Sequence, residues 1–251
     1  MKSCEKCRKR GLFRKTGKWI KINGLERREM ICRCGNVQLE EAPQNTVVFP
    51  KILYIDIETS TMKLEIETFD LKLRSDRLDW RDIVKSFYII SWAAAWVGDG
   101  EARIISDAVT PAEAKRRDDK RCLKKLWELI DQKADYVVGH NSKNFDIKKL
   151  ETRFFLNHMG TPSKYKQRDT LQIAKKRFRN ESNALAYWSK LLGGNPKDHM
   201  IKDDWLEVNK GNEKIIRKML KYNKGDVREG VNILRQFVEY IESNGQTKVF
   251  P

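Results

Sequence analysis

The first clear hydrophobic pattern in the chain is the ten-residue run 51–60, KILYIDIETS. Most of its apolar residues are β-branched and the run follows a proline, which is typical of a buried β-strand. Side chains alternate between the two faces of a strand. Asp56 and Glu58 are therefore expected to project from the same face.

Two neighbouring carboxylates repel each other, and burial increases the cost of each charge. A bound cation relieves both costs, and ligands that are all oxygens favour Mg²⁺ or Mn²⁺ over zinc. Alternatively, Asp56 and Glu58 lie at a solvent-exposed end of the strand. This run alone does not distinguish a metal site from an exposed strand end.

After this strand, short apolar runs alternate with helical repeats. Segments 87–97 and 102–106 flank a Gly-Asp-Gly turn and predict an antiparallel hairpin beside the first strand. Helices are predicted near residues 122–130, from 146, from 168, within 182–193 and through 215–226, with a short strand at 136–138. Residues 61–85 have no clear period and predict an irregular excursion or a partial hairpin. This order of elements predicts a mixed α/β sheet with at least one parallel pair.

Two further aspartates occur where helices are predicted. Gly139 and Asn141 suit a sharp strand-to-helix connection, and Asp146 follows near the start of the helix, where the helix dipole alone would favour an acid. Asp226 lies on the same helical stripe as Tyr222 and the apolar residues before it. Asp226 should thus point inward, and an inward aspartate is rare without a partner.

Composition places the chain among basic proteins without a membrane segment. Its 251 residues carry a net charge of +16, and 40% of them are hydrophobic. No apolar run approaches the roughly 20 residues of a membrane span, and the N-terminus lacks the apolar core of a signal peptide. We therefore expect a soluble, cytoplasmic protein with a nucleic-acid partner and no membrane partner. Charge alone does not separate DNA from RNA.

The N-terminal 35 residues form a basic block with twelve Lys or Arg against three Glu. Cys4 and Cys7 form one cysteine pair, Cys32 and Cys34 form a second, and this spacing matches a four-thiolate zinc ribbon. A segment of this length buries little apolar surface. One structural Zn²⁺ would therefore supply its folding free energy. A basic tail with incidental thiols is the alternative. The block resembles zinc ribbons attached to transposase-like and phage nucleases, although those usually have two residues between the second cysteine pair.

The predicted organisation is a zinc-ribbon nucleic-acid-binding module at residues 1–37, a linker at 38–50, a main domain at 51–245 and a tail at 246–251. Five cysteines in an intracellular chain favour a metal site or buried thiols over disulfides.

Three short motifs occur in order along the main domain. They are Asp56-Ile57-Glu58-Thr59, the Asn141–Asp146 segment with Phe145, and Tyr222 four residues before Asp226. From about residue 50 to 241 the chain resembles the DEDD superfamily of 3′–5′ exonucleases, in its tyrosine subtype. The resemblance is strongest to stand-alone relatives of the proofreading domain of family B DNA polymerases. It implies an RNase H-like fold, a mixed β-sheet flanked by helices.

The resemblance also implies a role for each motif residue. Two Mg²⁺ or Mn²⁺ ions about 4 Å apart would clamp the scissile phosphate. Asp56, Glu58 and Asp226 would bind the ion that activates water, with Asp56 bridging to a second ion held by Asp146. Tyr222 would orient the water. The expected contacts to the terminal nucleotide are Thr59, Asn141 and Phe145, although Phe145 suits the core equally well.

The function expected from this resemblance is metal-dependent 3′–5′ hydrolysis of DNA to nucleoside 5′-monophosphates. Trimming of RNA is an alternative, because no motif in the sequence indicates a contact to the 2′-hydroxyl that would distinguish RNA from DNA. A non-catalytic zinc-ribbon nucleic-acid-binding protein is a second alternative, but it has no need for all four acids and the tyrosine. The chain contains no polymerase module, so any proofreading for a DNA polymerase partner would occur in trans.

Overall fold

The computed structural model describes residues 6–7, 13–22, 25–41, 50–67, 78–98, 102–194, 200–243 and 248–250. The chain divides into two compact units, Met1–Phe49 and Pro50–Pro251. Each unit is described by itself. Cys4 lies outside the described residues, as does most of the expected linker.

The first unit contains a three-stranded antiparallel sheet in the order β1-β2-β3. Its strands are β1 (Phe13–Ile22), β2 (Leu25–Cys32) and β3 (Val37–Glu41). Cys32 ends β2, and Cys34 follows in a tight turn to β3. Gly35 closes this turn with φ +83°, a left-handed backbone conformation that favours glycine. The turn therefore keeps the second cysteine pair close together.

The second unit is built on a five-stranded mixed sheet in the order β10-β9-β4-β7-β8. Strand β4 pairs in parallel with β9 and antiparallel with β7, which confirms the predicted mixed sheet with a hairpin beside the first strand. The strands are β4 (Ile52–Thr59), β7 (Ile89–Val97), β8 (Ile104–Ala108), β9 (Tyr136–Gly139) and β10 (Lys166–Asp169). Strands β5 (Lys63–Leu64) and β6 (Ile83–Lys85) form a small separate sheet. The single-turn helix η2 (Trp80–Asp82) directly precedes β6.

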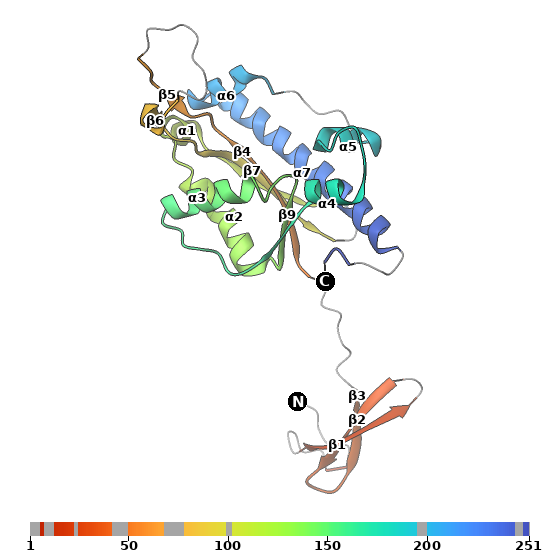
Figure 1. Cartoon of the computed structure of the whole chain (residues 1–251). Coiled ribbons are helices and arrows are strands. Elements are labelled where there is room, and N and C mark those ends of the chain that lie inside the picture. The colour runs from red at the N-terminus through yellow and green to blue at the C-terminus, as the bar shows by residue number, and fades with distance from the viewer. Residues whose placement is uncertain are drawn as a thin grey trace. The chain divides into compact units, whose positions relative to one another are not determined.

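Helices cover both faces of this sheet, and Figure 1 shows the long helix α7 crossing it. The helices are α1 (Pro111–Arg116), α2 (Lys120–Lys133), α3 (Asp146–Leu156), α4 (Thr170–Arg177), α5 (Leu185–Leu191), α6 (Lys202–Asn209) and α7 (Glu213–Glu242). The predicted α/β architecture, a mixed β-sheet flanked by helices, is thereby confirmed. No helix in the described part of the chain is both long and apolar enough to span a bilayer.

Alternation along β4 assigns its side chains to two different core clusters. Leu53, Ile55 and Ile57 belong to the core cluster that includes α2 and α3. Tyr54 belongs to the opposite cluster, which includes buried residues of α7. Because Asp56 and Glu58 follow Tyr54 at intervals of two, their carboxylates lie on the α7 face of the sheet.

Helix α7 approaches β4 closely at Gly230, where a Cβ atom would overlap the ring and hydroxyl of Tyr54. We expect Gly230→Ala to destabilise the protein by about 1–3 kcal/mol through overpacking, despite the roughly 1 kcal/mol that alanine gains in helix propensity. Gly225→Ala on the same helix is the matched control, because its Cβ meets nothing within 4 Å. Denaturant unfolding compares the two, and equal stabilities would contradict this close packing.

Several details differ from the sequence-based expectations, and helices α1 and α6 lie in segments where no element is predicted. Strand β10 was not predicted, because Lys166–Asp169 is polar and pairs only with β9 at the sheet edge. Helix α5 is shorter than the predicted 182–193. In the segment expected to be a tail, Val249 is buried and the Phe250 ring meets Tyr136 edge-on at 5.1 Å between centroids. The segment therefore contributes to the core.

Candidate active site

Three carboxylates converge between the end of β4 and the middle of α7. Asp56 and Glu58 come from β4, Asp226 comes from α7, and one oxygen from each lies within 4.8 Å of the others. Asp226 is only 7% exposed. Like charges at this spacing in a partly desolvated site repel one another, and all-oxygen ligands suit a hard divalent cation. The donor set therefore fits Mg²⁺ or Mn²⁺.

The fourth predicted acid, Asp146, reaches the same strand from another direction. It is the first residue of α3, and its Oδ1 accepts a hydrogen bond from the Ile57 amide at 3.1 Å. Ile57 lies between Asp56 and Glu58, so Asp146 is fixed next to the three-carboxylate cluster without being one of its members. Burial raises the pKa of Asp146 to about 7, although the Ile57 amide acts in the opposite direction.

Tyr222 lies one helical turn before Asp226 on α7 and is half-buried. Burial, and then the carboxylates of Asp226, Glu58 and Asp56, raise the pKa of its hydroxyl above the ordinary value. The phenol consequently stays protonated at neutral pH. It can donate or accept a hydrogen bond beside the acids, but it is a poor proton acceptor.

Asn223 is a site residue that sequence reasoning missed. It is fully buried on α7, and its Nδ2 donates a short hydrogen bond to Oδ2 of Asp56. This bond links α7 directly to β4 and orients one carboxylate of the cluster. Asn223 lies four residues after Met219 and three before Asp226, so its position on the inward stripe was available as a signal.

Residues 86–238, more than half of the chain, match the model of the RNase_H_2 family, described as RNase_H superfamily. The chain belongs to the RNase_H superfamily. Among solved structures, it is similar to the family B DNA polymerase from the hyperthermophilic archaeon Pyrobaculum calidifontis, with 17% identity and a TM-score of 0.49. That match covers 91% of this chain and 28% of the polymerase chain. None of the curated proteins compared with the chain matches it in sequence.

In this RNase_H superfamily domain, the loop before Asp146 is held by a second buried acid. Asp169 accepts hydrogen bonds from the backbone amides of Asn141 at 2.9 Å, Lys143 at 3.1 Å and Leu171 at 2.9 Å. Asn141 takes a left-handed backbone conformation with φ +62°. Asp169 is also the residue that caps the N-terminus of α4. The same carboxylate therefore both caps α4 and shapes the connection from β9 to α3.

We expect Asp169→Ala to destabilise the domain by about 1–3 kcal/mol, because buried amides lose their acceptor. The displaced loop should also lower kcat of the proposed hydrolysis by about 10²-fold. Asp131→Ala is the control, since Asp131 accepts from the Ser163 amide on an exposed surface and should change both quantities little. Unfolding curves and rates for both variants test this, and an Asp169→Ala protein with normal kcat would contradict it.

Arg117 fixes the chain just after the acidic strand. Its guanidinium donates to the Ser60 hydroxyl at 3.0 Å, the Asn209 side chain at 3.2 Å and the Thr61 carbonyl. The same guanidinium lies over the Tyr88 ring, 5.0 Å from its centroid. The segment that leaves β4 two residues after Glu58 is thereby tied to α1 and α6. Sequence patterns give no signal for this contact.

The three residues expected to contact a terminal nucleotide lie around the acids. Thr59 ends β4 just beyond a register shift in its pairing with β7. Asn141 and Phe145 are in the loop before Asp146, and Phe145 is 41% exposed. The core alternative for Phe145 is thus excluded, although its contact with substrate stays a prediction.

A cysteine cluster lies in the first unit. The sulfur atoms of Cys7, Cys32 and Cys34 are all within 4.8 Å of one another, and those of Cys7 and Cys32 are 3.7 Å apart. Cys32 is buried while Cys34 is exposed. Three convergent thiols fit a soft cation such as Zn²⁺. By contrast, Cys122 is buried in the core of the second unit, and burial raises its pKa.

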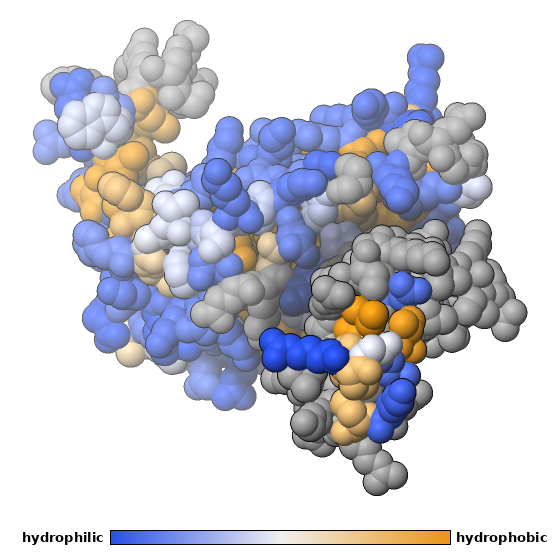
Figure 2. Space-filling model, turned by 90° about the horizontal axis from the view of Figure 1, so that it is seen from below, coloured by the Kyte–Doolittle hydropathy of each residue, from blue (hydrophilic) through white to orange (hydrophobic). Residues whose placement is uncertain are grey.

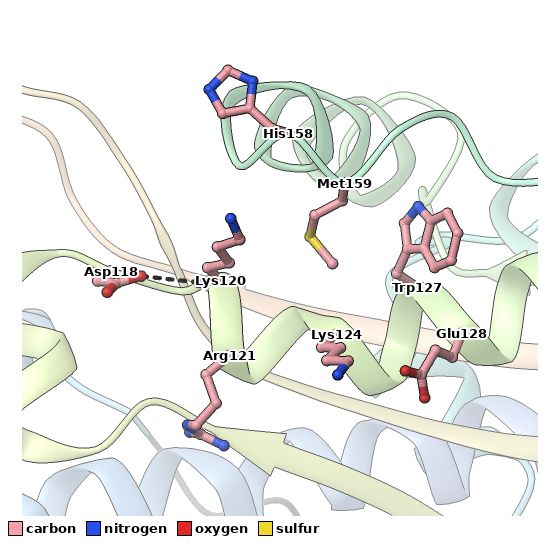
Figure 3. Close-up of a pocket in the computed structure, with 8 residues that line it drawn as sticks. All are labelled: Asp118, Lys120, Arg121, Lys124, Trp127, Glu128, His158 and Met159. Atoms are coloured by element: carbon pink, nitrogen blue, oxygen red, sulfur yellow. Dashed lines mark hydrogen bonds between the residues drawn. The ribbon is translucent and has the colours of Figure 1, made fainter.

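A separate hollow of about 570 Å³ lies between α2 and the turn after α3, and contains none of the candidate acids (Figure 3). Figure 3 shows Met159 reaching from the turn after α3 toward α2, while Lys120 on α2 points toward His158. On the face that Figure 2 shows, the coloured surface is predominantly hydrophilic, with hydrophobic side chains gathered in separate patches.

Proposed function

We propose that the protein is a metal-dependent 3′–5′ exonuclease of the tyrosine DEDD subtype, acting on single-stranded or frayed 3′ ends of DNA. The observation that carries the proposal is the convergence of Asp56, Glu58 and Asp226 within 4.8 Å. Membership of the RNase_H superfamily supports nuclease chemistry. The order and spacing of the three motifs support the 3′–5′ direction.

The residues of the acidic site have distinct proposed roles. Asp56, Glu58 and Asp226 would hold one divalent ion, and Asp56 with Asp146 would hold a second. Such ions, when bound, lower the pKa of water and stabilise charge on a phosphate that is under attack. Asn223 keeps the Asp56 carboxylate in one orientation through its hydrogen bond.

Tyr222 is proposed to orient the attacking water rather than to remove its proton. Its raised pKa keeps the hydroxyl protonated at neutral pH. Thr59, Asn141 and Phe145 are proposed to hold the terminal nucleotide. The exposed Phe145 ring offers a surface on which a base can stack.

The experiment that tests this function uses matched DNA and RNA strands, each blocked at its 3′ or its 5′ end. Purified protein is incubated with them in Mg²⁺, Mn²⁺ or chelator. We expect stepwise loss of nucleoside 5′-monophosphates from DNA with a free 3′ end, and none in chelator. Hydrolysis from the 5′ end would show that the proposed direction is wrong. A preference for RNA would show that the proposed substrate is wrong. No hydrolysis of any strand would refute it.

We further propose that the first unit is a zinc ribbon that binds nucleic acid. Cys7, Cys32 and Cys34 supply three of the ligands, and Cys4 is proposed as the fourth. The convergence of the three described sulfur atoms supports this assignment, and the Lys and Arg residues of the block supply charges that meet phosphates.

A further inference from the structure

Beside the acids, one lysine is held in place by aromatic rings instead of by carboxylates. The Nζ of Lys149, on α3, lies 3.6 Å from the centroid of the Phe87 ring and 5.8 Å from that of Phe145. Among the described residues, no hydrogen-bond acceptor lies within bonding distance of this ammonium group. We call Lys149, Phe87 and Phe145 the lysine cluster.

The lysine cluster lies at the start of α3, which carries Asp146, and on the segment that bonds to the end of β4. Lys149 lies one helical turn after Asp146 on α3, so both side chains are on the same side of the helix. Phe87 precedes Tyr88, whose carbonyl accepts from the Ser60 amide at 2.9 Å, and Ser60 follows Glu58 by two residues. The ammonium group is therefore placed near the exit of the acidic strand.

Phe87 is itself held by a buried ion pair. The Arg153 guanidinium donates to the Phe87 carbonyl at 3.3 Å and to both oxygens of Asp119 at 2.8 Å each. Asp119 is fully buried and also accepts from the Ile89 amide at 2.8 Å. The backbone of Phe87, two residues before β7, is thus anchored to the buried Arg153–Asp119 pair.

An ammonium group in this position is suited to an anion that arrives from outside. Cation–π contact orients the group, while it leaves its three donors available for hydrogen bonds. Burial lowers the pKa of Lys149, which reflects partial loss of hydration. A phosphate oxygen would restore hydrogen bonding to the cation, and phosphate is the anion that a nuclease brings to this site.

We propose that Lys149 binds a backbone phosphate of the single-stranded substrate next to the acidic site, with Phe87 and Phe145 flanking the bound strand. The proposal rests on the proposed nuclease function and adds a substrate-binding residue to it. It places a fixed cation beside a cluster of acids, where the divalent ions and the strand meet.

The test measures binding of a 5′-labelled DNA hexanucleotide in chelator, so that no hydrolysis occurs. Lys149→Met keeps an unbranched side chain up to the ε position, but removes the ammonium group that contacts Phe87. We expect about tenfold weaker binding, and a slope of log K against log salt that is smaller by about 0.7, equivalent to one phosphate contact. Lys149→Arg should keep most of the affinity. Lys148→Met, at the exposed neighbouring position, is the matched control and should change neither quantity.

A thermodynamic cycle locates the phosphate. Hexanucleotides with a single neutral methylphosphonate at successive linkages are bound to wild-type protein and to Lys149→Met. At one linkage the neutral substitution should weaken binding by wild type but not by the variant. Equal losses for both proteins at every linkage would overturn the proposal.

Folding and the main function are checked separately. Thermal unfolding of each variant confirms that it is folded, and Lys149→Gln takes the place of Lys149→Met if that variant unfolds. If wild type hydrolyses no strand in Mg²⁺, the nuclease proposal fails. The binding cycle still decides whether Lys149 contacts a phosphate, so the two failures are distinguishable.

Discussion

Asp226→Asn is expected to abolish Mg²⁺-dependent degradation of a DNA strand with a free 3′ end. The substitution keeps the shape of the side chain but removes one of three carboxylates that lie within 4.8 Å of one another. Weaker metal binding should cost several kcal/mol of charge stabilisation in the transition state. This loss corresponds to a hydrolysis rate that is lower by a factor on the order of 10³. Binding of Mn²⁺, followed by calorimetry, should weaken in parallel. Binding of a single strand in chelator should stay within about twofold of wild type.

The matched control for this variant is Glu229→Gln. Glu229 is also buried on α7, one turn after Asp226, but it accepts a hydrogen bond from the Ser189 hydroxyl at 2.7 Å and is not one of the three converging acids. Glutamine retains an acceptor for that bond, so the variant should keep its activity. If Asp226→Asn degrades DNA as fast as wild type, the acids have been assigned wrongly. If both variants lose activity and both unfold, the effect is one of stability.

The acids could be predicted from the sequence because each lies in a regular element with a clear period. Alternation along β4 puts Asp56 and Glu58 on one face, and the helical period of α7 turns Asp226 inward. Periodicity gives a direction for each side chain, but it does not give the distance between β4 and α7. That distance depends on the close contact of Gly230 with Tyr54, which joins residues far apart in the chain.

The residues that sequence analysis missed act through single long-range contacts. Arg117 bonds to Ser60 across 57 positions, and Asn223 bonds to Asp56 across 167. The helical period turns Asn223 inward, but no local pattern identifies the distant residue that either side chain contacts. Phe87 was read as the start of an apolar strand, and only its distance from Lys149 indicates a different role. Supporting contacts of this kind follow from the tertiary structure.

Cys4→Ser combined with Cys7→Ser is expected to reduce bound zinc from one ion per chain to none. The apparent binding free energy of a structural zinc is about 10–16 kcal/mol, so loss of two thiolates should unfold the first unit. Binding of long single strands should weaken, and its dependence on salt should become flatter because fewer Lys and Arg residues meet phosphates. Zinc content and binding in a salt series measure the two effects.

The same double variant should still hydrolyse short oligonucleotides. The acids, Tyr222 and the lysine cluster all belong to the second unit, which has its own hydrophobic core. Cys122→Ala is the control, because Cys122 is buried in that core and should not change the zinc content. A double variant that keeps its zinc would contradict the ribbon assignment. Loss of all hydrolysis, together with a lower unfolding temperature of the second unit, would mean that the ribbon is required for that unit to fold.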